Sequence, residues 1–458
     1  MRDVIFSVII LWLLPICYRR PFIGLLTFSW LAYMRTQDLC WGFAREQRWS
    51  FLIAIVTMLG YAGMRPEIWF RRNFRCFLMM LLVALVTIGV VIANQWTPTQ
   101  IDRWIEFTKI IAVALFTTAV VRTKAQLRVI IWVIALSLGF YGIKDGLVGV
   151  LTGMRAQILV GPGGMLADNN DFGLAMVMSL PMLLLIGISE ANKTLKRGVL
   201  LVLVPLTALT VMMTHSRGGF LALAAGFCVL VWRSRNRVAG FSIGALIVVT
   251  ALLVAPSSYI ERIKSIQNYE TDGSAMGRLA AWRTAINMAE DNPVFGVGLT
   301  LFLRNYTTYR SGEKNEGVRV AHNSYLQIWA ECGSLALGVY LLMMVLTLVG
   351  IWRIQKKARQ RYFTSWITEY ATMFEATWVA FIVGSTFLNR AHFDLAYHWI
   401  ALVIAFEAIA DHEMENTTAY PRRMGPGLGD LRSIENHGFK KRIGSPPSLG
   451  RPAVQGTA

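Results

Sequence analysis

Arg217, Arg278 and His322 are the residues whose chemical types and positions most readily support a function. Each lies where a polar connection meets an apolar or amphipathic segment. Guanidinium groups bind anions, and an imidazole can gain or lose a proton near neutral pH. We therefore expect an anion-binding site with a functional histidine on one face of the molecule.

Arg217 lies in TVMMTHSRGGFLAL, at a turn of two or three residues between two apolar runs. An interfacial arginine commonly extends its charged end into lipid headgroups, but the charge pattern described below disfavours a cation on this face. Gly218 and Gly219 would let another group approach the backbone closely. We therefore expect Arg217 to be functional. His215 offers a further donor, although lipid headgroups are its simpler environment.

The segment GSAMGRLAAWRTAINMAEDNPVFGVGLTLF, residues 273–302, has the pattern of an amphipathic helix that Asn292-Pro293 ends. Arg278 lies near the start of this helix, where free backbone N–H groups already favour an anion. Arg283 lies one and a half turns further along. Either arginine could instead face solvent, and Arg278 is the better candidate for binding.

His322 precedes NSYLQIWAECGSLALGVYLL, in which Asn323, Gln327 and Glu331 recur at intervals of four residues. This spacing places the three polar side chains on one helix face, and such groups are costly in lipid unless they face protein or a wet cavity. We expect the stripe to line a cavity that opens outward, with Asn323 near the helix cap. A lone histidine is often structural, but His322 would lie at the rim of this cavity.

GPGGMLADNNDFGLAM, residues 161–176, combines a glycine-rich turn with Asp and Asn side chains. An anion nest or a carboxylate metal site would use such residues, but a turn followed by a helix cap is the simpler interpretation. Asn169 is a candidate for contact with a sugar. The sequence has no Asp-x-Asp pair, no Cys/His cluster with ligand spacing and no P-loop, so we expect neither a metal nor another cofactor.

Membrane-spanning helices are the elements that must position these residues. Of the 458 residues, 55% are hydrophobic and 16% are charged, which is more apolar surface than a soluble core can bury. We therefore expect an all-α polytopic membrane protein with 12, or possibly 13, transmembrane helices, since the first two apolar runs are short. The apolar runs lie near residues 3–17, 21–34, 51–64, 76–93, 104–121, 127–148, 171–188, 198–214, 218–232, 240–256, 323–350, 370–388 and 395–410.

Lys and Arg side chains cluster in every second connection between these runs. The net charge is +18, and the clusters lie near residues 19–20, 65–75, 122–128, 193–197, 233–237 and 353–361. This is the positive-inside pattern, so the clusters predict cytoplasmic connections against anionic lipid, not a nucleic-acid groove. The remaining connections would face the other side of the membrane.

The chain divides into four expected regions: a transmembrane bundle at 1–256, a large external loop with amphipathic helices at 257–322, C-terminal transmembrane helices at 323–410 and a tail at 411–458. The tail is rich in Gly, Pro and charged residues, so we expect a disordered cytoplasmic segment.

Three segments together resemble the O-antigen ligase and polymerase superfamily of bacterial inner membranes: THSRGGFLALAAGF, GRLAAWRTAINMAEDNPVFGVGLTLF and AHNSYLQIWAECGSLALGVYLL. The N-terminal 44 residues and GPGGMLADNND resemble a branch described as probable O-glycosylation ligases. The resemblance implies a C-type glycosyltransferase fold, a multi-pass protein of the bacterial cell inner membrane and a periplasmic active site.

This resemblance also implies a reaction and its residues. The family transfers a glycan from an undecaprenyl pyrophosphate carrier to an acceptor hydroxyl, and its functional residues correspond to Arg217, Arg278 and His322, with Arg283 close enough to replace Arg278. Two guanidinium groups would neutralise the leaving diphosphate without a metal, and His322 would take the hydroxyl proton or orient the hydroxyl. We expect a single displacement that inverts the anomeric centre.

Ligation of O-antigen to lipid A–core oligosaccharide is the leading interpretation. Protein O-glycosylation or glycan polymerisation would use the same donor with another acceptor, and the sequence does not distinguish among these acceptors. A lipid-linked sugar flippase would need polar residues across the whole membrane, whereas the candidates here gather at the outer rim.

Overall fold

The computed structural model describes residues 1–234, 236–238, 240–242, 273–310, 317–362, 365–388 and 392–416. Most of the expected span at 240–256 and most of the expected tail therefore lie outside the described residues. Within these residues the chain forms helices joined by connections, with one isolated antiparallel bridge, between Val160 and Asp168, and no strand. The prediction of an all-α protein is confirmed for this part of the chain.

The N-terminal half contains α1 (Arg2–Arg19), α2 (Pro21–Met34), η1 (Thr36–Leu39), α3 (Phe43–Glu46), α4 (Trp49–Gly63), α5 (Phe74–Ala93), α6 (Pro98–Val120), α7 (Lys124–Leu151), η2 (Gly164–Leu166) and α8 (Asn169–Ser189). The rest contains α9 (Lys193–Gly198), η3 (Val199–Leu203), α10 (Val204–Met213), α11 (Arg217–Arg233), α14 (Gly273–Asp291), α15 (Phe302–Tyr309), α16 (Ser324–Lys357), η4 (Ala358–Tyr362), α17 (Ser365–Ser385) and α18 (Asp394–Asn416).

Five helical segments of the described chain are long and apolar enough to cross a membrane. These segments are Phe74–Ala93, Lys124–Leu151, Asn169–Ser189, Lys193–Met213 and Ser324–Gln360. A membrane protein is thus supported by length and composition. The expected number of 12 or 13 spans stays a prediction, because other helices that coincide with predicted runs are shorter or more polar.

Short polar side chains begin several helices. Thr123 and Gln126 form a reciprocal capping box at α7, Ser216 accepts a hydrogen bond from the Gly219 N–H at α11, and Asn323 accepts from the Tyr325 and Leu326 N–H groups at α16. Each cap supplies a partner for backbone N–H groups that a helix start leaves without one. These caps fix where the helices of the candidate site begin.

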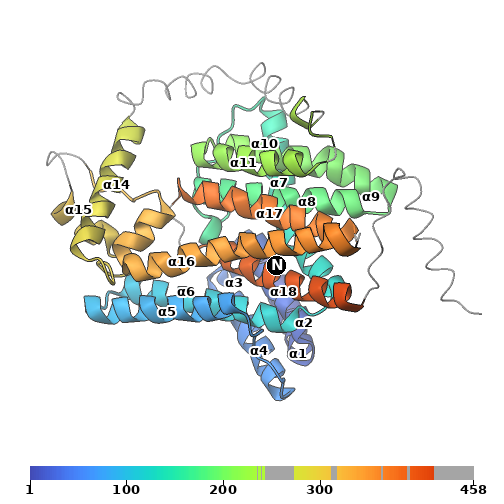
Figure 1. Cartoon of the computed structure of the whole chain (residues 1–458), viewed down its shortest axis with the longest axis horizontal. Helices are drawn as coiled ribbons and strands as arrows, with labels where there is room; N and C mark the ends of the chain where they lie inside the picture. Colours follow the sequence, from blue (N-terminus) through green and yellow to red (C-terminus); the bar gives the residue numbers. More distant parts are fainter. Residues whose placement is uncertain are drawn as a thin grey trace, which may run out of the picture.

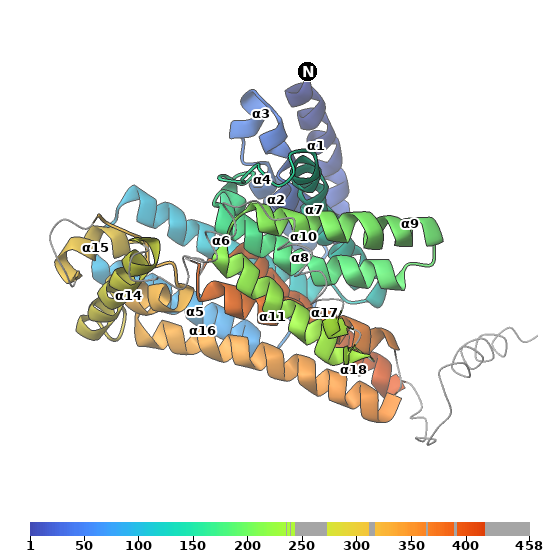
Figure 2. The ribbon, with the colours of Figure 1, turned by 90° about the horizontal axis from the view of Figure 1, so that it is seen from above.

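Helix α8 lies at the centre of the bundle, and nearly all of its residues are buried. It packs against α7, α10, α11 and α17. Gly142 lets α7 approach α10 closely, since a Cβ at Gly142 would overlap Thr207. Helices α1, α3 and α4 extend away from this bundle (Figures 1 and 2) and contribute to a separate apolar cluster.

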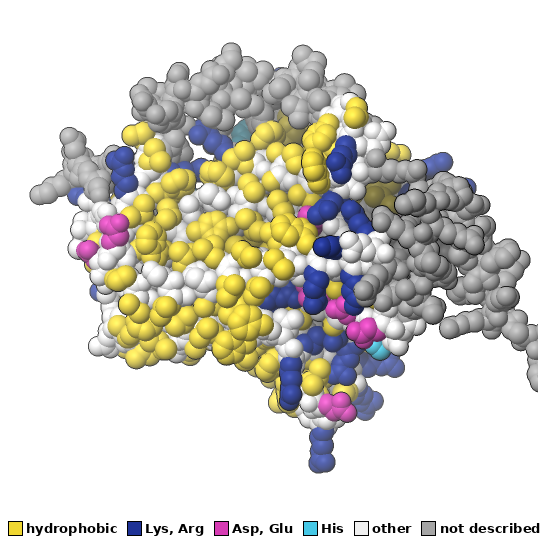
Figure 3. Space-filling model, viewed as in Figure 1, with side chains coloured by type: hydrophobic (Ala, Val, Ile, Leu, Met, Phe, Trp, Pro, Cys, Tyr) yellow, Lys and Arg dark blue, Asp and Glu magenta, His cyan; other side chains and the backbone are white. Residues whose placement is uncertain are grey.

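The two ends of the long helices differ in composition. Helices α14 and α15 lie together at the end where α16 begins, and α9 lies at the opposite end (Figure 1). The last turn of α16 carries Lys356 and Lys357, and Lys and Arg side chains gather toward that side of an otherwise largely hydrophobic face (Figure 3). The orientation in which this basic end faces the cytoplasm stays a prediction.

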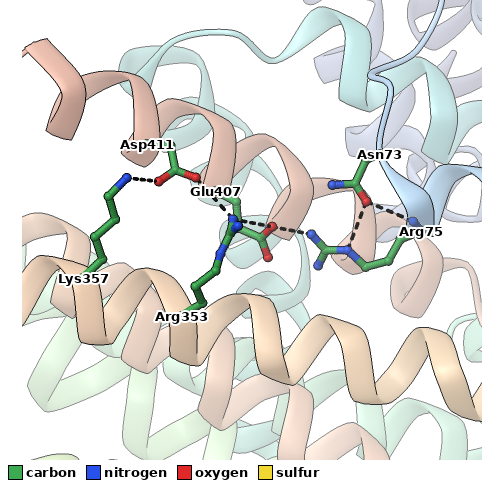
Figure 4. A network of polar contacts seen from close by, with 6 residues as sticks. All are labelled: Asn73, Arg75, Arg353, Lys357, Glu407 and Asp411. Carbon is green, nitrogen blue, oxygen red and sulfur yellow. Dashed lines mark hydrogen bonds and ion pairs between the residues drawn. The ribbon is translucent and has the colours of Figure 1, made fainter.

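A polar network joins three helices near the basic end (Figure 4). The Arg75 guanidinium of α5 donates to the Glu407 carboxylate of α18, and both side chains are almost fully buried. Asn73 accepts from Arg75, while Arg353 and Lys357 of α16 pair with Asp411 of α18. The network therefore connects α5, α16 and α18 at the end opposite to α14 and α15.

Helix α16 contains a break at Gly333, where φ is 80° and ψ is 178°. The segment after α14 inserts at this break: the Val297 N–H donates to the Ala330 carbonyl at 2.8 Å, and the Ser334 N–H donates to the Pro293 carbonyl at 2.8 Å. A Cβ at Gly333 would overlap the backbone of Val294, so only glycine fits. We call residues 273–310 the external segment, because the sequence predicts them in the external loop, and the backbone of α16 binds the connection that follows α14 directly.

Candidate functional site

Three connections and the start of α14 meet at the end of the bundle where α16 begins. The connections are the segments that precede α8, α11 and α16. Asn169, the first residue of α8, donates a hydrogen bond from Nδ2 to the Thr214 carbonyl at 3.0 Å. This bond attaches the start of α8 to the turn that carries His215 and Arg217.

Arg217 is the first residue of α11 and is half-buried. Thr214 and Ser216 are buried, so the turn that carries Arg217 is packed into the protein and is not a free surface loop. Gly218 faces Phe387 closely enough that a Cβ would contact the ring-bearing side chain at 2.7 Å. The glycines were predicted to let another group approach the backbone closely. At Gly218 the group that approaches is the Phe387 side chain.

His322 is half-buried and lies next to the same region. The next residues fix it in place: Ser324 donates from Oγ to the Leu388 carbonyl at 2.8 Å, one residue beyond Phe387. On the preceding side, the Trp282 indole N–H donates to the Ala321 carbonyl at 2.8 Å. Contacts from α14 and from the segment after α17 therefore hold the backbone on both sides of His322.

Arg278 and Asp168 are the charged groups that act on His322. Burial lowers the pKa of the His322 imidazole below its usual value of 6.5, the nearby Arg278 cation lowers it further, and the Asp168 carboxylate opposes them by raising it. The imidazole therefore favours its neutral form at pH 7, in which one ring nitrogen can accept a proton.

The structure discriminates between the two arginines of α14. Arg278 is half-buried and acts on His322, whereas Arg283 is exposed. A binding role for Arg278 and not for Arg283 stays a prediction. The start of α14 coincides with the amphipathic helix predicted from residue 273, and the helix ends at Asp291, directly before Asn292-Pro293.

The polar stripe of α16 differs from our expectation. Asn323 caps the helix as predicted, but Gln327 and Glu331 are 8% and 2% exposed and do not line an outward cavity. The Phe302 N–H donates to the Glu331 carboxylate at 3.3 Å, and Gln327 donates to the same carboxylate at 3.3 Å. The stripe instead supplies acceptors for the external segment, because buried backbone N–H groups there need partners.

Two residues near this site were not chosen from the sequence. A helix cap was the favoured interpretation of Asp168, and it does accept a hydrogen bond from the Asn170 N–H at 2.8 Å, but it also acts on His322. Arg35 follows α2 and lies against Gly163 and Gly164, in the segment before α8. The signal that identified Arg217, a cation in a connection where the positive-inside pattern disfavours it, applies equally to Arg35.

A cavity in the described part of the molecule lies away from this cluster. Its lining residues are Arg233, Trp352, Gln355, Lys356, Arg359 and Gln360. These residues lie at the far end of α11 and α16, beside the basic end of the bundle. Among the described residues, no three His, Cys, Asp or Glu side chains are grouped so that they could hold a metal ion.

Two family models match the chain. Residues 200–341 match a family described as O-antigen ligase, and residues 1–187 match a family of unknown function. No curated protein shows significant similarity. The first match contains Arg217, Arg278 and His322, and the second contains Asp168 and Asn169, so the clustered residues come from both matched regions.

Proposed function

Because this chain belongs to the O-antigen ligase superfamily, we propose that it transfers a glycan from undecaprenyl pyrophosphate to a hydroxyl of lipid A–core oligosaccharide. The reaction would take place at the periplasmic face of the bacterial inner membrane. Membership of the superfamily supports an O-antigen ligase or polymerase function with a lipid-linked donor. The choice of donor, acceptor and mechanism is our proposal.

The proximity of Arg278 to His322 is the observation that best supports this function. Arg278 belongs to α14 and His322 to the connection before α16, and the Arg278 cation acts on the His322 imidazole at the end of the bundle opposite to the basic connections. The Asn169 hydrogen bond attaches the Arg217 turn to the residue that follows Asp168, and Asp168 also acts on His322. A cationic and imidazole-containing cluster at this end is suited to a diphosphate donor whose lipid tail lies between helices.

In the proposed reaction, the acceptor oxygen attacks C1 of the donor sugar while the bond from C1 to the phosphate oxygen breaks. The diphosphate leaves on its lipid carrier, and Arg217 and Arg278 stabilise the negative charge that develops on it. One displacement inverts the anomeric centre. The hydroxyl proton passes to His322, whose lowered pKa keeps it neutral and able to accept that proton near pH 7.

Arg217→Ala and His322→Ala test the site in purified protein supplied with a lipid-linked glycan and lipid A–core. Losing one arginine that stabilises the leaving group should lower the rate about a hundredfold, and losing the base should lower it by about 10² to 10⁴. Arg304→Ala is the matched control, since Arg304 is exposed on α15 of the same external segment. Near-normal transfer by either site variant, with the protein inserted and folded, would remove that residue from the mechanism.

Metal independence has a separate test. Two arginines can supply the positive charge that a divalent ion supplies in other transferases, so transfer should continue in EDTA. Loss of activity in EDTA, with recovery only on addition of a divalent ion, would contradict this part of the proposal.

The acceptor and the flippase alternative are tested with one design. Detergent-solubilised protein receives the lipid-linked glycan together with lipid A–core or with a candidate acceptor protein, in separate reactions. We expect lipid A–core to gain the glycan. Transfer of the glycan to the acceptor protein alone would favour protein O-glycosylation. Elongation of the lipid-linked glycan would favour polymerisation. A flippase needs two compartments and would transfer to neither.

A further inference from the structure

The segment before α8 forms a closed turn. Val160 and Asp168 pair as an antiparallel bridge, the Gly161 N–H donates to the Ala167 carbonyl at 2.8 Å, and the Leu166 N–H donates to the Gly163 carbonyl at 3.0 Å. These bonds connect the two sides of the segment and leave Gly163 and Gly164 near its tip. We call residues 160–168 the glycine turn.

Arg35 lies against the tip of the glycine turn. It follows α2 with φ at 49°, and its guanidinium pairs with the Asp38 carboxylate of η1. A Cβ at Gly163 would lie 2.8 Å from Asp38 Oδ2 and 3.4 Å from Arg35 Nε, and a Cβ at Gly164 would overlap the Arg35 guanidinium. The ion pair thus occupies the space that side chains at the tip would fill.

The bundle also holds the point where α2 ends and the connection after it begins. The Tyr141 hydroxyl of α7 donates to the Met34 carbonyl at 2.6 Å, directly before Arg35. Arg35 is 21% exposed and Asp38 is 13% exposed, so both side chains are largely enclosed. The pair is therefore fixed from one side by α7 and from the other by the glycine turn.

The base of the glycine turn reaches the candidate site. Asp168 ends the turn and caps α8, and Asn169 binds the Thr214 carbonyl of the Arg217 turn. The charge of Asp168 acts on His322. A rigid turn of nine residues therefore runs from the Arg35–Asp38 pair to the residues around His322.

We propose that Arg35 is a positioning residue of the transfer site: paired with Asp38, it clamps the glycine turn and so fixes Asp168 and Asn169 at the start of α8, where Asn169 binds the Arg217 turn. This inference rests on the proposed transfer function for its kinetic consequence, but the packing of Arg35 against the glycine turn does not. Arg35 itself touches neither donor nor acceptor in this scheme. The Arg35–Asp38 pair, which lies between α2 and η1, would position residues of later segments that carry out the reaction.

Gly164→Ala and Gly153→Ala form a matched pair of variants. Both glycines lie in the connection between α7 and α8 with similar φ values, 53° at Gly164 and 58° at Gly153, so both alanines strain the backbone alike. No atom lies within 4 Å of a Cβ at Gly153, whereas a Cβ at Gly164 displaces Arg35. A difference between the two variants therefore reports the contact with Arg35.

The readout is the protonation of His322, followed in the full-length protein by mass spectrometry of C2-hydrogen exchange at histidine across pH. The charged groups facing His322 are Arg278 of α14 and Asp168 before α8. Moving the Asp168 carboxylate away removes the one anion that favours the imidazolium, so the His322 titration should shift to lower pH in Gly164→Ala. Gly153→Ala should titrate like the unchanged protein.

Arg35→Ala, Arg35→Lys and Asp168→Asn complete the test. Arg35→Ala should shift the titration in the same direction as Asp168→Asn, and combining the two should add no further shift, because both act through one carboxylate. Arg35→Lys should restore part of the shift by keeping the ion pair. In the glycan-transfer assay, the acid limb of the rate should move to lower pH with the titration. The rate near neutral pH should separately fall about tenfold in Gly164→Ala, because a displaced glycine turn also moves Asn169, which binds the Arg217 turn.

Two outcomes would overturn the inference: equal His322 titrations in Gly164→Ala and Gly153→Ala, or additive shifts from Arg35→Ala and Asp168→Asn. The titration needs no activity, so it separates this inference from the proposed function. Absence of transfer in the unchanged protein would defeat the proposed function alone, while an unshifted titration in an active Gly164→Ala protein would defeat the positioning role alone.

Discussion

Arg35, His215 and His322 share a backbone conformation that side chains rarely adopt. Their φ values are 49°, 51° and 47°, in the left-handed region. This conformation costs about 1–2 kcal/mol per residue, so the surrounding structure must impose it. All three residues lie in connections at the end of the bundle that holds the candidate site. They are three of the eight non-glycine residues with positive φ in the described part of the chain.

At the same scale, the two arginines of α14 should differ in a mutational test. Arg278→Gln removes a cation that acts on His322 and that we place on the leaving diphosphate, so the transfer rate should fall by about a hundredfold. The lost cation also removes one cause of the lowered His322 pKa. That pKa should rise toward 6.5, and the acid limb of the rate profile should move to higher pH.

Arg283→Gln is the control for this prediction, because Arg283 is exposed on the same helix. Its rate and pH profile should match those of the unchanged protein when transfer is measured from pH 5 upward. The roles of the two arginines would have to be exchanged if Arg283→Gln lost activity while Arg278→Gln kept it.

Among the elements, α16 shows which features the sequence could predict. Its start at the Asn323 cap and its long apolar body were predictable, because a capping residue and a membrane-length run are local signals. The break at Gly333 was not, because it depends on a backbone segment that inserts from far along the chain. The polar stripe was wrongly predicted to line an outward cavity, because the spacing alone could not show that the Phe302 N–H would be a partner of Glu331.

Gly333→Ala should detach the external segment from α16. Alanine is strongly disfavoured at this φ and ψ, at a cost of about 1–3 kcal/mol, and its Cβ would also overlap the Val294 backbone. We expect a lower melting temperature in nanodiscs and reduced glycan transfer, since Arg278 belongs to the displaced segment.

Gly338→Ala provides the comparison on the same helix. No atom lies within 4 Å of a Cβ there, and alanine favours a helix over glycine by about 0.5–1 kcal/mol. Its melting temperature should be equal or slightly higher. Similar melting temperatures for both variants would show that the break at Gly333 does not secure the external segment.

Across the whole molecule, Arg217, Arg278 and His322 lie at the end away from the basic clusters, and their place in a functional site at that end stays a prediction. Hydropathy and charge are properties of each short stretch of sequence, so the predicted side of each connection follows from local composition. The sequence analysis did not select Asp168 and Arg35 as site residues, because their proposed roles depend on which distant segments pack together. A carboxylate before a helix looks the same in sequence whether it only caps the helix or also faces an imidazole.

The network at the opposite end (Figure 4) should stabilise the arrangement of α5, α16 and α18. Glu407→Ala would leave the Arg75 guanidinium buried without its carboxylate, and breaking a buried ion pair costs about 3–5 kcal/mol. The melting temperature should fall markedly.

Asp411→Asn is the control, because Asp411 is more exposed and its partners are partly in solvent, where ion pairs contribute about 0–1 kcal/mol. It should melt close to the unchanged protein. A melting temperature unaffected by Glu407→Ala would show that the buried pair does not hold these helices together.

The Asn169 hydrogen bond to the Thr214 carbonyl crosses the border between the two matched regions, residues 1–187 and 200–341. With Asp168 also acting on His322, the border runs through the candidate site instead of around it. The two regions are therefore not interchangeable modules. A hybrid that joins the first region of one homologue to the second region of another would inherit mismatched halves of the candidate site, even where each half inserts and folds correctly.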